Sequence, residues 1–234
     1  MKNALITAAT KGIGKAVAFA FAFEGLNLAI CSRNADDLEE LKAELLAIYP
    51  NINIFTAEVD CSNRKELIGF ATNSEKALGN IDVIVNNVGI YRMNSILDDT
   101  LHDFEEQLNT NLRPAYELYR FFGKKMMLAK SGHIFNICSV ASINPIAAAG
   151  TYSVTKYALL GLNKVMRQEM EPFGVKVTAV IPGSTLTNSW KGVEVDKDKM
   201  VLPEDVAAAI VNAFKMSPGA NVEEITIKPV YGQL

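Results

Sequence analysis

A tyrosine and a lysine stand four residues apart, in Tyr152-Ser153-Val154-Thr155-Lys156, and Ser139 precedes the tyrosine by thirteen positions. Four residues make about one helical turn, so a helix places the phenol and the ammonium on the same face. An ammonium beside a phenol favours the phenolate and lowers a pKa that is ordinarily about 10. We therefore expect this pair to donate and accept a proton near neutral pH.

A second candidate site is the turn Thr7-Ala8-Ala9-Thr10-Lys11-Gly12-Ile13-Gly14-Lys15, which follows a predicted strand and precedes an apolar helix. Gly12 and Gly14 let the backbone approach a pyrophosphate closely. A helix N-terminus adds free N–H groups and the positive end of the helix dipole. The turn therefore predicts a dinucleotide site.

The residues after the second predicted strand indicate which dinucleotide this is. The dinucleotide fingerprint has an acid about 20 residues beyond the turn, which binds ribose hydroxyls. Here the strand ends in Ile30-Cys31-Ser32-Arg33-Asn34, so the carboxylate is missing and Arg33 stands just beyond the strand. Lys11 lies in the glycine turn itself. Two cations near the ribose 2′ position suit a phosphate, which favours NADP over NAD; the alternative is that both are solvated loop cations.

The elements that must position these residues alternate between strands and helices. Apolar runs predict strands at Ala4–Thr7, Leu26–Cys31, Asn53–Ala57, Val83–Asn86, His133–Cys138, Val175–Ile181 and Glu224–Ile227. Amphipathic segments predict helices at Ala35–Tyr49 (with Asn34 as N-cap), Arg64–Leu78, Asp103–Lys130, Thr151–Glu171 and Pro203–Lys215. The alternation predicts an α/β fold with one doubly wound parallel sheet and helices on both faces. The loops at the carboxyl ends of the strands then meet at one edge, where ligands bind.

Composition is that of one globular domain, residues 1–234. The chain is 49% hydrophobic and 21% charged with a net charge of −3, so we expect neither nucleic acid nor a membrane as a partner. No apolar run reaches spanning length, and the N-terminus lacks a signal-peptide pattern. The cysteines Cys31, Cys61 and Cys138 are too few for a disulfide framework, so we expect them reduced and buried in a cytoplasmic protein.

Taken together, these residues resemble the short-chain dehydrogenase/reductase family over essentially the whole chain. Thr7 to Gly14 is similar to the family's glycine motif, although Ala8 stands where the family usually has its first glycine; we expect modest consequences. Asn86-Asn87-Val88-Gly89 resembles the family's Asn-Asn-Ala-Gly motif. The resemblance implies a single Rossmann-like domain with a short substrate lid near residues 188–202, assembled as a homotetramer or homodimer.

The resemblance also implies roles for single residues. The implied catalytic set is Asn111, Ser139, Tyr152 and Lys156. The implied NADP(H) site consists of Thr7, Thr10, Lys11, Gly12, Ile13, Gly14, Arg33, Asp60, Cys61, Asn87, Gly89, Tyr152, Lys156, Pro182, Gly183 and Thr187. Asp60 is expected to meet the adenine, and the segment from Pro182 to Thr187 the nicotinamide carboxamide.

The expected reaction is hydride transfer between NADPH and the carbonyl carbon of a small molecule. Tyr152 is expected to act as general acid/base, and Ser139 to hold the carbonyl oxygen near it. Lys156 is expected to lower the pKa of Tyr152 and, by resemblance, to hold the nicotinamide ribose. Asn111 is expected to hold a water that links Lys156 to solvent.

The segments near the family's substrate positions indicate a largely apolar pocket that fits a ketone, an aldehyde or a 3-ketoacyl group. The residues concerned are Tyr91, Met93, Ile143, Ile146 and Ala147. Trp190 lies in the expected lid, where it covers a substrate or packs the loop. The leading subtype is a carbonyl reductase or 3-oxoacyl-acyl-carrier-protein reductase. The chain ends without the glycine-rich stretch of the latter, and so resembles NADP-dependent alcohol or 3-hydroxy acid dehydrogenases, or sepiapterin-reductase-like members.

Other classes of function fit less well. A non-catalytic NADP-sensing protein on the same fold remains an alternative, although Tyr152 and Lys156 are both present. A hydrolase lacks its Gly-x-Ser-x-Gly elbow. His102 and His133 have no partner at metal-ligand spacing, so we predict no metal site.

Two long predicted helices, Asp103–Lys130 and Thr151–Glu171, carry apolar residues beyond one stripe. These residues are Phe121, Phe122, Met126, Met127, Leu159, Leu160 and Leu162. They indicate a second buried face between subunits, or else deeper burial within one subunit.

Overall fold

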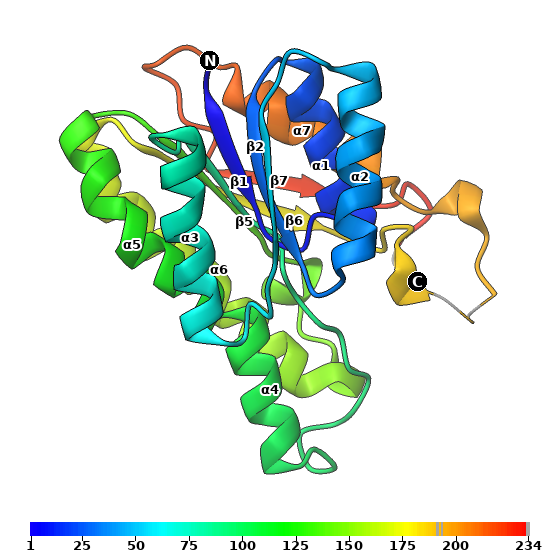
Figure 1. Ribbon diagram of the computed structural model, residues 1–234. Helices are drawn as coiled ribbons and strands as arrows, with labels where there is room; N and C mark the ends of the chain where they lie inside the picture. The colour runs from blue at the N-terminus through cyan, green and yellow to red at the C-terminus, as the bar shows by residue number, and fades with distance from the viewer. Residues whose placement is uncertain (191, 193, 233–234) are drawn as a thin grey trace.

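The computed structural model describes residues 1–190, 192 and 194–232 of the chain. Its centre is a parallel sheet of seven strands in the order β3-β2-β1-β4-β5-β6-β7 (Figure 1). The strands are β1 (Asn3–Ile6), β2 (Asn27–Ser32), β3 (Ile54–Glu58), β4 (Val83–Asn86), β5 (His133–Ile137), β6 (Lys176–Pro182) and β7 (Glu224–Ile227). All seven predicted strands form within one residue of their expected ends. Because the strand order reverses between β1 and β4, the loops after these two strands part there and leave room for a ligand.

Helices cover both faces of the sheet, as predicted (Figure 1). One face carries α1 (Gly12–Phe23), α2 (Ala35–Ile48) and α7 (Pro203–Phe214), and the other carries α3 (Arg64–Leu78), α5 (Arg113–Ala129) and α6 (Gly150–Met170). Each layer has its own apolar core against the sheet. The shorter helix α4 (Leu101–Asn111) extends past the carboxyl ends of the strands. Asn34 caps α2 as predicted, since its side chain accepts a hydrogen bond from the Asp37 N–H at 2.8 Å.

The predicted single helix Asp103–Lys130 is wrong, because it is broken at Leu112 into α4 and α5. Pro114 occupies the first turn of α5. A proline has no N–H to donate to the preceding turn, and its ring disfavours helical backbone in the residue before it. The break makes Asn111 the last residue of α4.

The apolar residues assigned to a second face of these helices lie in the core of the subunit itself. Phe122, Met126, Leu159 and Leu160 are buried, while Phe121, Met127 and Leu162 are partly buried and pack against the same core. Burial within one subunit therefore accounts for the four buried side chains, while a contact between subunits stays a prediction for the three that are partly exposed.

Among the described residues, no helix is both long enough and apolar enough to cross a membrane.

Candidate active site

The glycine turn brings the end of β1 against the start of α1. A Cβ on Gly14 would lie 2.4 Å from the Ala8 carbonyl oxygen and 2.6 Å from Nδ2 of Asn87, so only glycine fits there. Gly12 has a φ of +54°, and a Cβ on it would lie 3.0 Å from Cγ2 of Thr187. The turn thus lies within contact distance of the segment that follows β6.

Ala8, which replaces the family's first glycine, has a φ of +52°. This left-handed conformation costs a residue with a Cβ roughly 1–2 kcal/mol. The chain therefore keeps the backbone shape of a glycine turn although it lacks the glycine. As a result, Ala8 is a locally strained residue.

Thr7 and Asn87 connect the turn to the segment that follows β4. The buried Thr7 hydroxyl accepts hydrogen bonds from the N–H groups of Asn87 and Val88 at 3.0 and 3.1 Å. The Asn87 amide donates to the carbonyls of Thr7 and Ala8 at 3.0 and 2.9 Å. Both residues thus hold β1 and the 86–89 segment together, while Thr10 and Ile13 are half-buried on the turn itself.

The N-terminus of α1 faces the turn without a side-chain cap, because Lys11 at the N-cap position makes no such hydrogen bond. Its first N–H groups therefore remain available to an anion. The Lys11 ammonium is paired with Asp37 of α2, with Nζ 2.6 Å from Oδ2. Arg33, at the end of β2, is exposed. Of the two cations predicted near the ribose, Arg33 is exposed and Lys11 has an acidic neighbour.

The loop after β3 contains the predicted adenine contacts. Asp60 is exposed, and its Oδ1 accepts from the N–H and the hydroxyl of Ser62 at 2.9 and 2.7 Å. Cys61 is buried, with its Sγ 3.8 Å from the Sγ of Cys31. The hydrogen bond with Cys31, and then burial, hold the pKa of Cys61 well above its ordinary value. All three cysteines are free and buried, as predicted.

Ser139, Tyr152 and Lys156 meet at the carboxyl end of β5. Ser139 follows that strand, and α6 carries the other two residues one turn apart. The Ser139 hydroxyl lies close enough to the Tyr152 phenol to lower its pKa, and it also accepts from the Ala141 N–H at 3.1 Å. The Lys156 ammonium is buried, 5.7 Å from the centre of the Tyr152 ring, and donates to the Ile137 carbonyl at 2.9 Å. The predicted helix face and the predicted position of Ser139 are both present.

The pKa of Tyr152 shifts in the direction opposite to the prediction. Burial raises the pKa of the Tyr152 phenol, and the neighbouring Ser139 hydroxyl lowers it by less. Burial also lowers the pKa of Lys156, to about 8. The expected lowering of the Tyr152 pKa is therefore wrong in this structure: removal from water outweighs the nearby ammonium, which bonds to a carbonyl instead. At neutral pH the phenol carries its proton.

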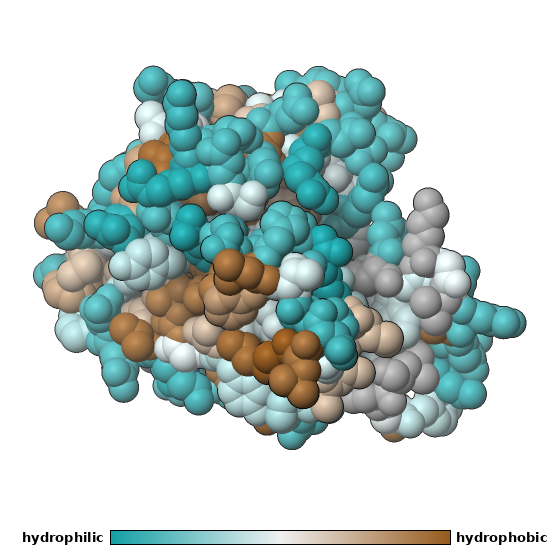
Figure 2. Space-filling model, turned by 90° about the horizontal axis from the view of Figure 1, so that it is seen from below, coloured by the Kyte–Doolittle hydropathy of each residue, from teal (hydrophilic) through white to brown (hydrophobic). Residues whose placement is uncertain are grey.

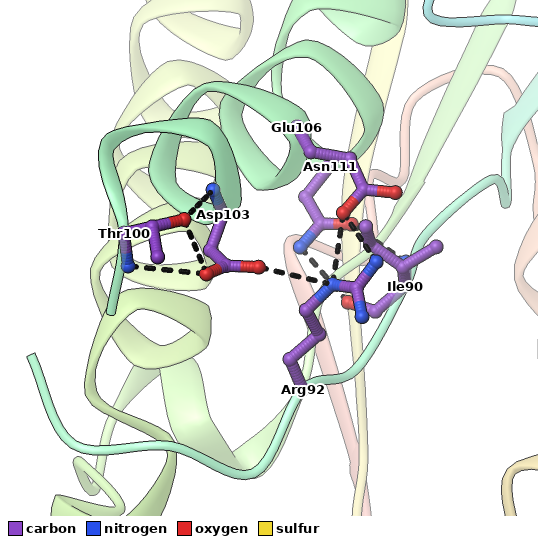
Figure 3. A network of polar contacts seen from close by, with 6 residues as sticks. All are labelled: Ile90, Arg92, Thr100, Asp103, Glu106 and Asn111. Carbon is purple, nitrogen blue, oxygen red and sulfur yellow. Dashed lines mark hydrogen bonds and ion pairs between the residues drawn. The ribbon is translucent and has the colours of Figure 1, made fainter. Parts of the chain in front are cut away.

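Asn111 connects three parts of the site. Its Oδ1 accepts from the Ile90 N–H at 2.7 Å, and its Nδ2 donates to the Ile90 carbonyl at 3.1 Å (Figure 3). Nδ2 also donates to Oγ1 of Thr155 at 3.0 Å. A Cβ on Gly89 would lie 3.4 Å from both Asn111 Oδ1 and Lys156 Nζ, so this segment passes directly beside them. The water-holding role of Asn111 stays a prediction.

Two residues of this arrangement were not assigned a role from the sequence. Thr155 accepts from Asn111 and donates to the Tyr152 carbonyl at 2.8 Å, which joins α4 to the turn of α6 that carries the phenol. Tyr91, predicted only to flank the pocket, packs edge-to-face on Tyr152 with ring centres 4.9 Å apart. Thr155 lies three residues after Tyr152, but threonine is common on helices, and no local pattern marks either contact.

The segment after β6 closes the other side of the site. The Gly183 N–H donates to the Ile227 carbonyl at 2.8 Å, which ties the end of β6 to β7. Thr187 lies against Gly12, and Trp190 lines a depression of about 430 Å³ together with Thr187 and Lys197. Residues 191 and 193 of the expected lid lie outside the described residues. In the described part of the chain, no cluster of three or more His, Cys, Asp or Glu side chains could hold a metal ion.

Comparisons with known proteins agree with this geometry. The family model described as short chain dehydrogenase matches residues 2–198. A sepiapterin reductase of Chlorobaculum tepidum is 34% identical over 98% of this chain and 97% of that protein. Dehydrogenase/reductase SDR family member 6 of Rattus norvegicus is also 34% identical, over 98% of this chain and 89% of its own.

Solved structures show the same fold. An alcohol dehydrogenase from the archaeon Thermococcus sibiricus, complexed with 5-hydroxy-NADP, superposes with a TM-score of 0.93 at 27% identity, covering 100% of this chain and 99% of that one. A metagenomic short-chain oxidoreductase in complex with NADP has a TM-score of 0.85 at 27% identity, covering 98% and 97%. The chain belongs to the short-chain dehydrogenase/reductase family and is an oxidoreductase of that family.

The residues present fit the dinucleotide that the family uses. Gly14 leaves no room for a side chain beneath the turn, and the uncapped N-terminus of α1 offers its N–H groups to a pyrophosphate. Arg33 stands exposed just after β2, where the sequence predicts a contact with a 2′-phosphate.

Proposed function

We propose that the protein is an NADPH-dependent reductase that converts the carbonyl of a ketone, an aldehyde or a 3-ketoacyl group to an alcohol. The observation that carries this proposal is the meeting of Ser139, Tyr152 and Lys156 at the carboxyl end of β5, with the Lys156 ammonium 5.7 Å from the centre of the Tyr152 ring and the pKa of the phenol raised by burial. A phenol that keeps its proton at neutral pH is a donor, and reduction of a carbonyl consumes a proton.

Each residue of the set has a part in this reaction. When bound, NADPH supplies the hydride. Tyr152 donates its proton to the carbonyl oxygen as negative charge develops there, and Ser139 donates a hydrogen bond that holds this oxygen beside Tyr152. The Lys156 ammonium stabilises the phenolate that remains. Asn111 holds the Ile90 backbone and Thr155 in place around them.

NADP(H) is the proposed cofactor because of the exposed Arg33 and the missing acid after β2. A guanidinium binds phosphate with several charge-assisted hydrogen bonds, whereas a ribose hydroxyl gains less from it. The two structural neighbours described above were solved with NADP or 5-hydroxy-NADP.

A second candidate within the same chemistry is a sepiapterin-reductase-like enzyme acting on a pterin carbonyl, favoured by the Chlorobaculum tepidum relative. An NADP-dependent alcohol or 3-hydroxy acid dehydrogenase is the same reaction run toward oxidation. The presence of Ser139, Tyr152 and Lys156 together at one site argues against a purely NADP-sensing role, which would need none of the three side chains.

The test is the loss of NADPH absorbance, in parallel with NADH, over a panel of ketoacyl thioesters, diketones, aldehydes and a pterin. Tyr152→Phe is expected to lower kcat by about a thousandfold, and Ser139→Ala by about a hundredfold, while both keep the melting temperature. Tyr49→Phe, remote from the site, is the matched control. Turnover that survives in Tyr152→Phe would contradict the assignment of the acid, and a preference for NADH would contradict that of the cofactor.

A further inference from the structure

The tripeptide Ile90-Tyr91-Arg92 is held at both ends by α4. At one end, the Asn111 side chain bonds to both the N–H and the carbonyl of Ile90. At the other, Nε of Arg92 donates to Oε2 of Glu106 at 2.8 Å (Figure 3). Backbone on either side of Tyr91 is therefore fixed to one rigid element.

Arg92 also lies near a second carboxylate of α4, that of Asp103. Its Nε lies 3.9 Å from Oδ1 of Asp103, whose other oxygen accepts from the Thr100 N–H at 3.1 Å. The Asp103 N–H in turn donates to the Thr100 hydroxyl at 3.1 Å, which closes a capping box at the start of α4. One carboxylate thus caps the helix and faces the guanidinium (Figure 3).

Tyr91 stands between these two attachments with its ring against the catalytic ring. The ring centres of Tyr91 and Tyr152 are 4.9 Å apart at an interplanar angle of 80°. Tyr91 nevertheless stays 42% exposed. Part of its surface therefore packs on Tyr152, and the rest is exposed.

Exposed apolar side chains follow both Tyr91 and Ser139 in the chain. Met93, Ile143 and Ile146, on the segments that follow Tyr91 and Ser139, are exposed at 74%, 38% and 36%. Apolar side chains gather on the face toward which α4 extends (Figure 2). Arg92, the cation next to Tyr91 in the chain, is already paired with Glu106 and Asp103, so it does not offer its charge to a substrate carboxylate.

We propose that Tyr91 is a specificity-determining residue, which selects carbonyl compounds bearing an aromatic or other flat apolar group beside the reacting carbon. The proposal rests on the carbonyl reductase function. A carbonyl oxygen placed at Ser139 and Tyr152 brings its neighbouring substituent to the exposed part of the Tyr91 ring, where an aromatic group gains an edge or stacking contact. Asn111 and Arg92 are positioning residues, since they hold the backbone on either side of Tyr91.

The experiment compares benzil with diacetyl, two diketones that differ in phenyl against methyl substituents, with NADPH as reductant. Tyr91→Ala is expected to lower kcat/KM for benzil about tenfold, chiefly through KM, and to leave diacetyl within about twofold. Tyr91→Phe is expected to retain both values, because the ring remains. An equal loss on both diketones would overturn the proposal, since Tyr91 would then only support Tyr152.

The positioning role has its own variants. Arg92→Met is expected to raise KM for benzil in the same direction as Tyr91→Ala but about threefold, and Arg92→Lys to restore part of the loss. Lys125→Met, which removes an ion pair with Glu75 between α5 and α3, is the matched control and should change neither substrate. Equal effects of Arg92→Met and Lys125→Met on KM for benzil would contradict the positioning role of Arg92.

Binding separates this proposal from the proposed function. Calorimetry with NADP⁺ and benzil is expected to show about tenfold weaker benzil binding to Tyr91→Ala than to wild type, whether or not turnover is seen. Tyr49→Ala is the control, because Tyr49 also packs edge-to-face, on Phe23. Should Tyr91→Ala melt early, Tyr91→Leu replaces it. Unchanged benzil affinity in Tyr91→Ala would overturn the role of Tyr91. If benzil binds and its binding depends on Tyr91, but no turnover is seen, only the proposed reductase function would be overturned.

Discussion

At the scale of single residues, burial moves both partners of the Tyr152 and Lys156 pair toward their uncharged forms. It raises the pKa of the phenol and lowers that of the ammonium to about 8. The Ser139 hydroxyl beside the phenol opposes this shift in its pKa. The phenol is thus a proton donor at rest, and the ammonium stabilises the phenolate only once the proton has left.

Arg33 is expected to decide the choice between the two dinucleotides. Arg33→Ala should raise KM for NADPH about thirtyfold, because a charge-assisted hydrogen bond is worth about 2 kcal/mol, and should leave KM for NADH nearly unchanged. Lys11→Ala should have a smaller effect, since Lys11 is paired with Asp37. Steady-state kinetics with both cofactors measures this; equal losses with NADPH and NADH would contradict the assignment.

His133 is expected to make the fold acid-sensitive. Burial, with smaller contributions from Lys176 and Lys2, lowers the pKa of His133 to about 3 from an ordinary 6.5. Between these values the unfolded chain binds a proton that the folded protein does not, so the free energy of unfolding falls as pH falls, by up to about 1.4 kcal/mol per unit. Above pH 6.5 this loss vanishes.

His133→Leu should remove that slope in denaturant titrations between about pH 6 and pH 4. His102→Leu, at an exposed histidine, is the control and should keep the slope. A slope that is the same in wild type and His133→Leu would show that other groups cause the acid sensitivity.

At the scale of elements, the turn between β1 and α1 stores strain at Ala8. Because the left-handed region costs a residue with a Cβ more than it costs glycine, Ala8→Gly is expected to raise the free energy of unfolding by about 1 kcal/mol. Lys130, at the end of α5 with a φ of +50°, is the matched site away from the dinucleotide. Lys130→Gly should also stabilise the fold but should leave KM for NADPH unchanged. A less stable Ala8→Gly protein would show that the alanine methyl makes a contact worth more than the strain.

The break between α4 and α5 also acts at this scale. It ends α4 at Asn111, whose amide then reaches Ile90 and Thr155 on two other segments. Pro114 therefore contributes to the site without approaching it.

At the scale of the whole molecule, α6 presents an exposed stripe whose side chains differ from those that the sequence analysis assigned to a subunit interface. Val154, Tyr157 and Val165 are 46%, 42% and 51% exposed, and Gly161 between the last two has open space in front of it. Apolar residues beside a glycine allow another helix to approach closely. We propose that this stripe packs against a second copy of the chain.

Light scattering is expected to show a dimer or tetramer for the wild type, whose mass does not change on moderate dilution. Val165→Asp should shift the mass toward the monomer, because it places a charge in an apolar contact. Leu128→Asp, at an exposed residue of α5, should not. A wild type that is monomeric throughout would contradict the assembly.

The sequence by itself determined the order of the elements, the parallel sheet and the identity of the residues that meet at its edge. Apolar runs and amphipathic periods are local patterns, and one helical turn between Tyr152 and Lys156 has the same geometry in any fold. Only the tertiary structure decided how those residues behave. The raised pKa of Tyr152, the pairing of Lys11 with Asp37, the contact of Tyr91 with Tyr152 and the burial of Phe122 depend on segments far apart in the chain and on how much water they exclude. Desolvation depends on how the whole molecule packs, so it cannot be predicted from the spacing of residues in the sequence.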